Sequence, residues 1–499
     1  MQVNVEKYQK SVKGDDDVAI SVINKAKGLF SQKAIERAAL MFRRGDDKQL
    51  ISLLKTIGSI APARYHRETF KQLAEMVEKD DPFVGVIKRI VLELNPHCLS
   101  KLIQNLIVNF MVLGRGIRDK KEKEYHVHLP NFMVISPTMR CNLHCKGCYA
   151  GEYDTTGELT FDELDKLLND AKELGMFFFT FSGGEAFFRR DLLDLWEKHG
   201  DCYFQVYTNG TLLDEAMVSR LVDLGNVMPM ISVEGDREET DFRRGSGIYD
   251  KVINAYQRLY EAGVMFGFSA TCTRSSAEYM SQDEFIRTMI ERGCKIGWFF
   301  QYIPIGANPD MSYMATPEQR AFLHKKVEAW RYSKDFPIFI GDFWNDGPYV
   351  DGCMAAGERY WHVISDGSVE PCVFAPFAVD NIREKSLVEI AGSPFFTYIR
   401  NQLPYHGEDN LLRPCMILDH PDVLRDAVHK FGAKPCHCGL EKILSGTIPE
   451  GLDSYARRIK AIYDPLWEDG EKEKYLKSLE REDKKELLER MNPPTSSRS

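Results

Sequence analysis

The spacing of hydrophobic and polar residues divides the 499-residue chain into regions with different periodicity. Between residues 18 and 118, apolar residues recur at the three- and four-residue spacing of amphipathic helices. In residues 97–114 the apolar positions form one unbroken stripe: Leu99, Leu102, Ile103, Leu106, Ile107, Phe110 and Leu113. This pattern predicts a helical N-terminal domain over residues 1–125, and the charged run at 118–126 indicates a solvated linker.

Beyond this run, short apolar and β-branched segments alternate with helical stretches, which predicts strands. The six predicted strands are residues 132–138, 176–182, 202–208, 227–233, 264–272 and 296–304. Alternating strands and helices form right-handed βαβ units, so we expect an α/β domain with a parallel sheet over residues 126–340. The sheet would be either an open doubly wound sheet or a partial barrel, and both bind ligands at the carboxyl ends of their strands.

From residue 341 the sequence becomes irregular and rich in glycine and proline. Its cysteines are Cys353, Cys372, Cys415, Cys436 and Cys438. The segment has few periodic apolar runs, so we expect bound metal to help fold an irregular third domain over residues 341–445. For residues 446–499 we expect a charged helical extension that ends in a polar tail.

Charge and hydropathy narrow the function classes. The formal net charge of −9 divides into +7 for residues 1–130 and −16 for the remainder. An acidic chain argues against nucleic-acid binding, so no nucleic-acid partner is expected. The sequence has no apolar segment near the ~18–20 residues that a spanning helix needs and no signal peptide, which predicts a cytoplasmic protein. Twelve cysteines in such a protein favour metal binding or catalysis over disulfides.

The most specific motif is Cys141, Cys145 and Cys148, directly after the first predicted strand. Three thiols on one strand-end loop can converge on one inorganic centre. A structural zinc site or an electron-transfer cluster normally uses four protein ligands. Three cysteines therefore indicate a centre that keeps one coordination position for a substrate or cofactor.

A second motif follows the second predicted strand. Gly183 and Gly184 allow the backbone to approach a ligand closely, and the Glu185 carboxylate can accept hydrogen bonds from an ammonium group. Such a triplet alone is most often a turn. Its position one βα unit after the cysteine loop favours a ligand site.

Together, CNLHCKGCY at 141–149 and FSGGEA at 181–186 resemble the motifs of the radical S-adenosylmethionine (radical SAM) enzymes. The resemblance covers roughly residues 128–335 and implies a partial (βα)6 barrel of the TIM type. It also implies that the three cysteines hold a [4Fe–4S] cluster whose fourth iron is chelated by S-adenosylmethionine. The family usually has proline where Ala186 stands, which affects loop stiffness more than chemistry.

The same resemblance implies an activity. One electron, supplied by a reductant of the flavodoxin or ferredoxin type, would cleave S-adenosylmethionine to a 5′-deoxyadenosyl radical, which abstracts hydrogen from an unactivated carbon. By similarity, the cofactor-binding candidates are Gly183, Gly184, Glu185, Asn209, Ser232 and Arg244. For the last three residues, the alternatives of a turn, a helix cap and a solvated arginine stay open.

The later cysteines resemble the auxiliary-cluster domains of the SPASM and twitch types, beginning with GCMAAGERYWHVISDGSVEPC at 352–372. The SDGSVEP segment within it predicts a β-hairpin turn. The downstream cysteines are too few for the two clusters of the long SPASM form. We expect one auxiliary [4Fe–4S] cluster, held by Cys353, Cys372, Cys415 and either Cys436 or Cys438, with zinc as the alternative metal.

The sequence does not decide whether the substrate is a ribosomally made peptide or protein, a lipid or a small molecule. A non-enzymatic iron–sulfur or zinc scaffold is the remaining alternative to an enzyme. The stripe in 97–114 is followed by a basic cluster of Arg115, Arg118, Lys120, Lys121 and Lys123. Interfacial helices combine such features, which predicts peripheral membrane contact through 97–123 or an amphiphilic substrate. Burial of the stripe against neighbouring helices is the alternative.

Overall fold

The structure is a computed structural model that describes residues 47–60, 64–151, 153–306, 308–437 and 439–479. The helices expected before residue 47 and the tail after residue 479 lie outside the described residues.

In the described residues, ten strands form one sheet in the order β11-β9-β8-β1-β2-β3-β4-β5-β6-β7. The barrel strands are β1 (Phe132–Ile135), β2 (Phe178–Phe181), β3 (Tyr203–Thr208), β4 (Val227–Ser232), β5 (Gly267–Cys272) and β6 (Ile296–Gln301). They pair in parallel in sequence order, which confirms the six predicted strands. β7 (Phe339–Asp342) continues the parallel sheet and was not predicted, because its four residues carry little alternation.

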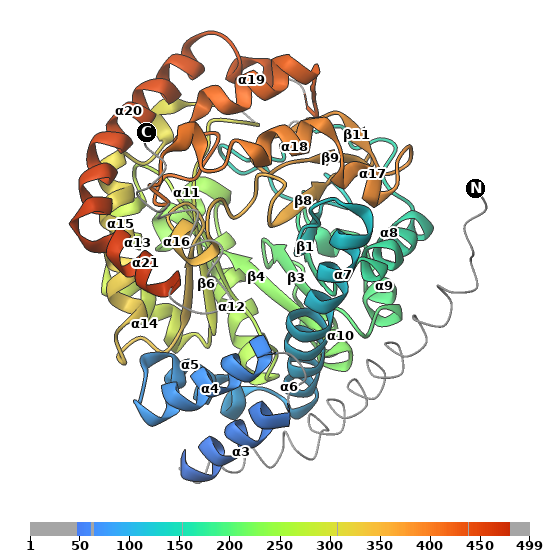
Figure 1. The fold of residues 1–499 in the computed structure, drawn as a ribbon, viewed down its shortest axis with the longest axis vertical. Helices are drawn as coiled ribbons and strands as arrows, with labels where there is room; N and C mark the ends of the chain where they lie inside the picture. The colour runs from blue at the N-terminus through green and yellow to red at the C-terminus, as the bar shows by residue number, and fades with distance from the viewer. Residues whose placement is uncertain (1–46, 61–63, 152, 307, 438, 480–499) are drawn as a thin grey trace, which may run out of the picture.

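The connecting helices pack on the outer face of these strands (Figure 1). They are α8 (Phe161–Glu173), α9 (Leu192–Lys198), α10 (Glu215–Leu224), α11 (Arg237–Arg244), α12 (Ile248–Glu261), α13 (Ala277–Met280), α14 (Asp283–Glu291) and α15 (Pro317–Arg331). Capping boxes begin α8 at Thr160 and α15 at Thr316. The α/β class and the partial (βα)6 barrel are thus confirmed.

The N-terminal helices cover one end of this barrel, opposite the C-terminal helices α18 and α19 (Figure 1). They are α3 (Asp47–Ile60), α4 (Arg64–Glu78), α5 (Pro82–Glu93), α6 (Pro96–Lys101) and the π-helix η1 (Leu102–Gly114). α7 (Arg115–Tyr125) continues from η1 and leads away from that end (Figure 1).

Polar side chains fix these helices to the loops that precede the strands. The amide of Asn105 donates to the carbonyl of Cys202 (2.8 Å) and that of Asn109 to the carbonyl of Asp201 (2.7 Å). Arg89 donates to the carbonyls of Cys294 and Pro337, each at 3.0 Å. Because these loops lie at the amino ends of β3, β6 and β7, the helices are anchored at the barrel end opposite the cysteine loop.

The predicted solvated linker at 118–126 is wrong over most of its length, since residues 115–125 form α7. Arg118 is buried, and its guanidinium donates to the carbonyl of Gly175 before β2 (2.7 Å). Lys120 and Lys123 are exposed on the same helix. The charge run is therefore the polar face of a docked helix.

The C-terminal region continues the same sheet. β8 (Tyr360–Val363) pairs in parallel with β1 and antiparallel with β9 (Ser368–Glu370), which confirms the predicted hairpin. The remaining elements are α16 (Gly347–Val350), β10 (Phe377–Ala378), β11 (Asp380–Asn381), α17 (Leu387–Ala391), α18 (Pro394–Asn401), α19 (Pro421–Phe431), β12 (Lys434–Pro435), α20 (Thr447–Leu466), η6 (Trp467–Glu471) and α21 (Lys472–Leu479), with short 3₁₀ turns between several of them. The domain boundaries given above stay predictions.

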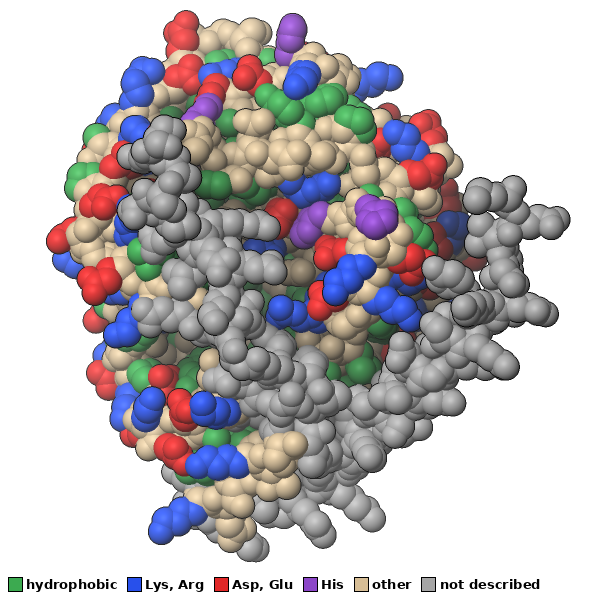
Figure 2. Space-filling view, in the orientation of Figure 1, with side chains coloured by type: hydrophobic (Ala, Val, Ile, Leu, Met, Phe, Trp, Pro, Cys, Tyr) green, Lys and Arg blue, Asp and Glu red, His purple; other side chains and the backbone are tan. Residues whose placement is uncertain are grey.

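Two surface properties bear on partners. Figure 2 shows acidic and basic side chains interspersed over the described surface of one face, so the net charge is not gathered there. Among the described helices, none combines the length and the apolar character needed to cross a bilayer.

Candidate active site

The three cysteines of the first motif lie on the loop that follows β1, and all three line one cavity. Hydrogen-bond donors point at two of their sulfurs. The backbone N–H of Leu143 lies 3.4 Å from Cys141 Sγ, and the Arg244 guanidinium lies 4.0 Å from Cys145 Sγ. Donors of this kind stabilise the negative charge of a thiolate ligand. The donor set therefore fits a cysteine-ligated iron–sulfur cluster.

Gly183 and Gly184 line the same cavity, and the structure explains why glycine is needed there. A Cβ atom on Gly184 would lie 2.2 Å from the carbonyl oxygen of Arg140, and Gly183 has a φ of +102°. The Gly184 and Glu185 amides donate to the carbonyls of Thr138 (3.0 Å) and Arg140 (2.9 Å). The two glycines thus let the second motif pack directly against the backbone of the cysteine loop.

The Glu185 carboxylate is buried and holds the next strand end in place. It accepts hydrogen bonds from the Thr208 hydroxyl and the Asn209 backbone N–H, both at 2.8 Å. Burial raises the pKa of Glu185. Asn209 lines the cavity, whereas Glu185 is not among the described residues that line it. Glu185 therefore positions Asn209, and its predicted contact with an ammonium group stays a prediction.

Arg244 is not the solvated arginine of the alternative reading. The Glu234 carboxylate accepts hydrogen bonds from Arg243 (2.6 Å) and from Arg244 Nε (2.7 Å), and its side chain is 1% exposed. Burial alone would raise the pKa of Glu234, but the two arginine charges outweigh burial and lower it. One carboxylate between two guanidinium groups leaves one net positive charge beside the cysteine loop, which suits a carboxylate ligand.

Sequence analysis missed Glu234, Arg243 and Gln301 at this site. Gln301 ends β6, lines the cavity and is 3% exposed. Neither polar atom of its amide has a hydrogen-bond partner among the described residues. Buried amides are nearly always paired, so this one indicates a position where a polar ligand binds. Its place at a strand end was the one available signal.

Ser232, the remaining predicted cofactor residue, ends β4 and also lines the cavity, whose volume is about 800 Å³. Five of the six predicted cofactor residues therefore face one space together with the three cysteines: Gly183, Gly184, Asn209, Ser232 and Arg244. Their individual contacts with a cofactor stay predictions.

Cys353, Cys372 and Cys415 line a second, small cavity and are all buried. Each sulfur accepts a backbone N–H at 3.4 Å, from Ala355, Phe374 and Ile417 respectively. Convergent buried thiols with N–H donors are typical of an iron–sulfur site. The structure thus brings together three of the predicted auxiliary ligands.

Cys436, one of the two predicted fourth ligands, does not line this cavity in the described structure. The pairing of β12 with β10 leads the chain elsewhere, and Cys436 packs against a buried cluster that includes Tyr153 and Ile364. The other candidate, Cys438, lies outside the described residues.

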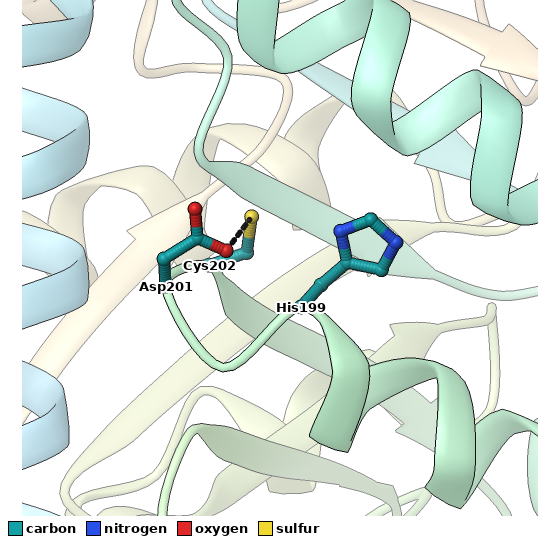
Figure 3. Close-up of side chains that lie close together, drawn as sticks. All are labelled: His199, Asp201 and Cys202. Carbon is teal, nitrogen blue, oxygen red and sulfur yellow. Dashed lines mark hydrogen bonds between the residues drawn. The ribbon is translucent and has the colours of Figure 1, made fainter.

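One further group of potential metal ligands lies at the opposite end of β3, where Figure 3 shows His199, Asp201 and Cys202. Each has a protein partner. His199 pairs with Asp165 (2.9 Å), Lys172 lies 3.4 Å from Asp201, and Cys202 donates to Asp201 (3.7 Å). Burial raises the pKa of Cys202 well above its ordinary value, which keeps the thiol protonated. This group belongs to the loop that anchors η1 through Asn105 and Asn109.

Two family models match the chain. Residues 135–272 match the radical SAM superfamily, and residues 353–416 match the iron–sulfur cluster-binding domain SPASM. The chain therefore carries a radical SAM domain and a SPASM domain. The resemblance of both cysteine groups is thereby confirmed. The two domains imply [4Fe–4S] clusters and bound S-adenosylmethionine, and the thiols, arginines and Gln301 fit both groups.

Relatives of this radical SAM protein include several enzymes. It is 29% identical over 231 residues to Fe-coproporphyrin III synthase of Methanosarcina barkeri, and the alignment covers 44% of this chain and 57% of that protein. It is 25% identical over 288 residues to an AdoMet-dependent heme synthase of the same organism, with 52% and 82% covered. PqqA peptide cyclase of Granulibacter bethesdensis is 26% identical over 315 residues, with 59% and 81% covered.

Among solved structures, SuiB of Streptococcus suis bound to precursor peptide SuiA superposes with a TM-score of 0.50 at 17% identity. The match covers 67% of this chain and 87% of SuiB. At this identity the likeness supports the fold.

Proposed function

We propose that this protein reductively cleaves S-adenosylmethionine and removes a hydrogen atom from an unactivated carbon of a substrate held in the 800 Å³ cavity. The observation that carries the proposal is the convergence of three thiols, Arg244 and the unpaired amide of Gln301 on that one space. When bound, the cluster and S-adenosylmethionine would supply the one-electron cleavage chemistry, with methionine and 5′-deoxyadenosine as products once a hydrogen atom has left the substrate. A reductant of the flavodoxin or ferredoxin type would supply the electron.

The residues of the protein would bind and orient the cofactor and shield the reaction from water. Arg243 and Arg244, fixed by Glu234, offer a cationic surface for the carboxylate of the cofactor. Glu185 holds the backbone of Asn209 so that its side chain faces the cavity. The barrel walls exclude water from a reactive species that would otherwise be quenched.

The auxiliary site lies against the same cavity. Phe343, Met354 and Phe374 line both the small cavity of Cys353, Cys372 and Cys415 and the large one. A cluster held by these three cysteines would be separated from the substrate by a thin apolar wall. This arrangement supports a role as electron acceptor for the substrate, with Cys436 outside the ligand set.

A peptide substrate is the second candidate, favoured by the similarity to PqqA peptide cyclase. A non-enzymatic scaffold has less support, because it needs neither an open coordination position nor a cavity beside it.

The direct test uses anaerobically reconstituted protein with dithionite and S-adenosylmethionine. We expect 5′-deoxyadenosine as a product, measured by mass spectrometry, and loss of at least 100-fold in its rate of formation in a Cys141→Ala variant. Cys98→Ala is the matched control, since Cys98 is a buried thiol in α6 whose pKa burial raises to about 11. Equal rates for the Cys141→Ala variant and the unaltered protein would refute the assignment of the first cluster.

A further inference from the structure

The large cavity does not end at the cofactor residues. It continues between inward-facing strand residues such as Thr180, Tyr207 and Trp298 to the opposite end of the barrel. There it is lined by Ile296 and Phe339, which begin β6 and β7, and by α5 and η1. The barrel therefore encloses a passage from the cysteine loop to the N-terminal helices.

The apolar stripe of residues 97–114 faces this passage. Leu99, Leu102, Ile103, Leu106, Ile107 and Phe110 all line the cavity. On another side of η1, Asn105 and Asn109 bind the loop before β3, which fixes the orientation of the helix. Leu99 and Leu102 are buried in a hydrophobic cluster with Met228, and the stripe as a whole borders the cavity, so it forms part of the wall of a hydrophobic tunnel.

We propose that the substrate is the hydrocarbon chain of a membrane phospholipid, which enters the tunnel at the N-terminal helices and presents a carbon to the cofactor end. The inference rests on the proposed function and names its substrate class. A peptide in the distal tunnel would bury backbone N–H and C=O groups against leucine, isoleucine and phenylalanine side chains. A hydrocarbon chain has no polar groups to satisfy and gains from burial.

The outer end of the tunnel is suited to a lipid. Met111 and Phe339 line the cavity and yet are 47% and 42% exposed, so the tunnel reaches the surface between η1 and β7. Lys120 and Lys123 are exposed on α7, the next helix after η1. An apolar rim followed by cationic side chains is the combination that binds anionic membrane surfaces. An anionic phospholipid is therefore the occupant to test.

The decisive experiment follows the hydrogen atom. Reconstituted full-length protein is incubated with S-adenosylmethionine, dithionite and phosphatidylglycerol vesicles whose acyl chains are perdeuterated. The atom that leaves an acyl carbon ends in 5′-deoxyadenosine, so we expect the singly deuterated product by mass spectrometry. Vesicles deuterated only in the glycerol headgroup should give unlabelled product.

A tunnel variant and a matched control separate the tunnel from the fold. Ile107→Trp fills the passage, and we expect at least a tenfold loss of deuterium transfer from acyl chains. Val112→Trp is on the same helix, is half-buried and does not line the cavity, so transfer should persist. The control Val112→Trp should also form 5′-deoxyadenosine at the unaltered protein's rate when no lipid is present.

The failures of the two proposals are distinguishable. Formation of 5′-deoxyadenosine without deuterium from acyl chains, or equal transfer in Ile107→Trp, would overturn the lipid inference and leave the proposed function standing. Absence of 5′-deoxyadenosine under all conditions would overturn the proposed function.

Retention of radiolabelled dipalmitoyl phosphatidylglycerol after separation from vesicles gives a readout that needs no catalysis. We expect the unaltered protein to retain about one lipid per chain and Ile107→Trp to retain far less. Equal retention by the unaltered protein and Ile107→Trp would contradict the tunnel.

Discussion

Gly184 is the residue whose role is most sharply defined by geometry, because its missing side chain determines how closely two loops approach. A Cβ at this position would lie 2.2 Å from the Arg140 carbonyl oxygen and 2.6 Å from that of Met139, so Gly184→Ala must displace the cysteine loop. We expect the variant to lose the first cluster, about four irons per chain, while it keeps the auxiliary cluster. Iron analysis after reconstitution measures the loss.

Gly116→Ala is the control for this prediction. Gly116 lies in α7, and a Cβ there would meet no atom within 4 Å in the described structure. In a helix, the change from glycine to alanine is expected to stabilise by up to about 1 kcal/mol. A Gly184→Ala protein with full iron content would show that the close packing of the two loops is dispensable.

At the scale of single residues, the sequence could identify those site residues that occur together in a short motif. The thiols of Cys141, Cys145 and Cys148 occur close together in the chain, and the structure places them on one cavity. Glu234 and Gln301 could not be found in this way, because their roles depend on partners that come together only in the barrel. For Arg244, a cofactor contact and a solvated arginine both stayed open in the sequence until the buried Glu234 was located.

At the scale of elements, the amphipathic stripe of 97–114 was predictable from its periodicity, but what it faces was not. The periodicity shows only that one face avoids water, and a tunnel wall, a packed core and a membrane surface satisfy it equally. Asn105 and Asn109 resolve the ambiguity by fixing the helix to the loop before β3. The charged run that looked like a linker is also fixed by a polar contact. The Arg118 guanidinium donates to a buried backbone carbonyl, which docks the helix onto the barrel.

One buried ion pair joins α15 to the auxiliary domain. Arg320 donates to Asp419 (2.6 Å), both side chains are 0% exposed, and Asp419 also accepts from the Cys415 backbone N–H (3.0 Å). Arg320→Met leaves a buried carboxylate unpaired, which is expected to cost about 3–5 kcal/mol. We expect loss of the auxiliary iron, with formation of 5′-deoxyadenosine retained.

Two further variants test the cause of that loss. Arg320→Met combined with Asp419→Leu removes both charges and should recover much of the stability, as measured by denaturant unfolding of the holoprotein. Arg458→Met, which breaks the exposed pair between α20 and α15 with Glu318, should change stability by about 1 kcal/mol or less. If Arg320→Met and Arg458→Met are equally stable, the buried pair does not organise the auxiliary site.

For the whole molecule, the arrangement is a barrel that is used from both ends. The cofactor residues lie at the carboxyl ends of the barrel strands, and the SPASM hairpin extends the sheet beside β1. The N-terminal helices line the passage that begins at the amino ends (Figure 1). Alternation of strands and helices made the barrel predictable. The open passage was not predictable, because inward-facing residues of a barrel normally fill its interior.

The metal content tests this arrangement as a whole. Three cysteines gather at each of two separate cavities, so we expect about eight irons per chain, of which about four remain when Cys141, Cys145 and Cys148 are all replaced. Because Cys436 packs away from the auxiliary cavity, Cys436→Ala should keep all eight. Iron and zinc are measured together by mass spectrometry of the anaerobically purified protein. About twelve irons would require a third cluster. Zinc in the triple variant would identify the auxiliary site as a zinc site. Loss of about four irons in Cys436→Ala would show that Cys436 is a cluster ligand after all.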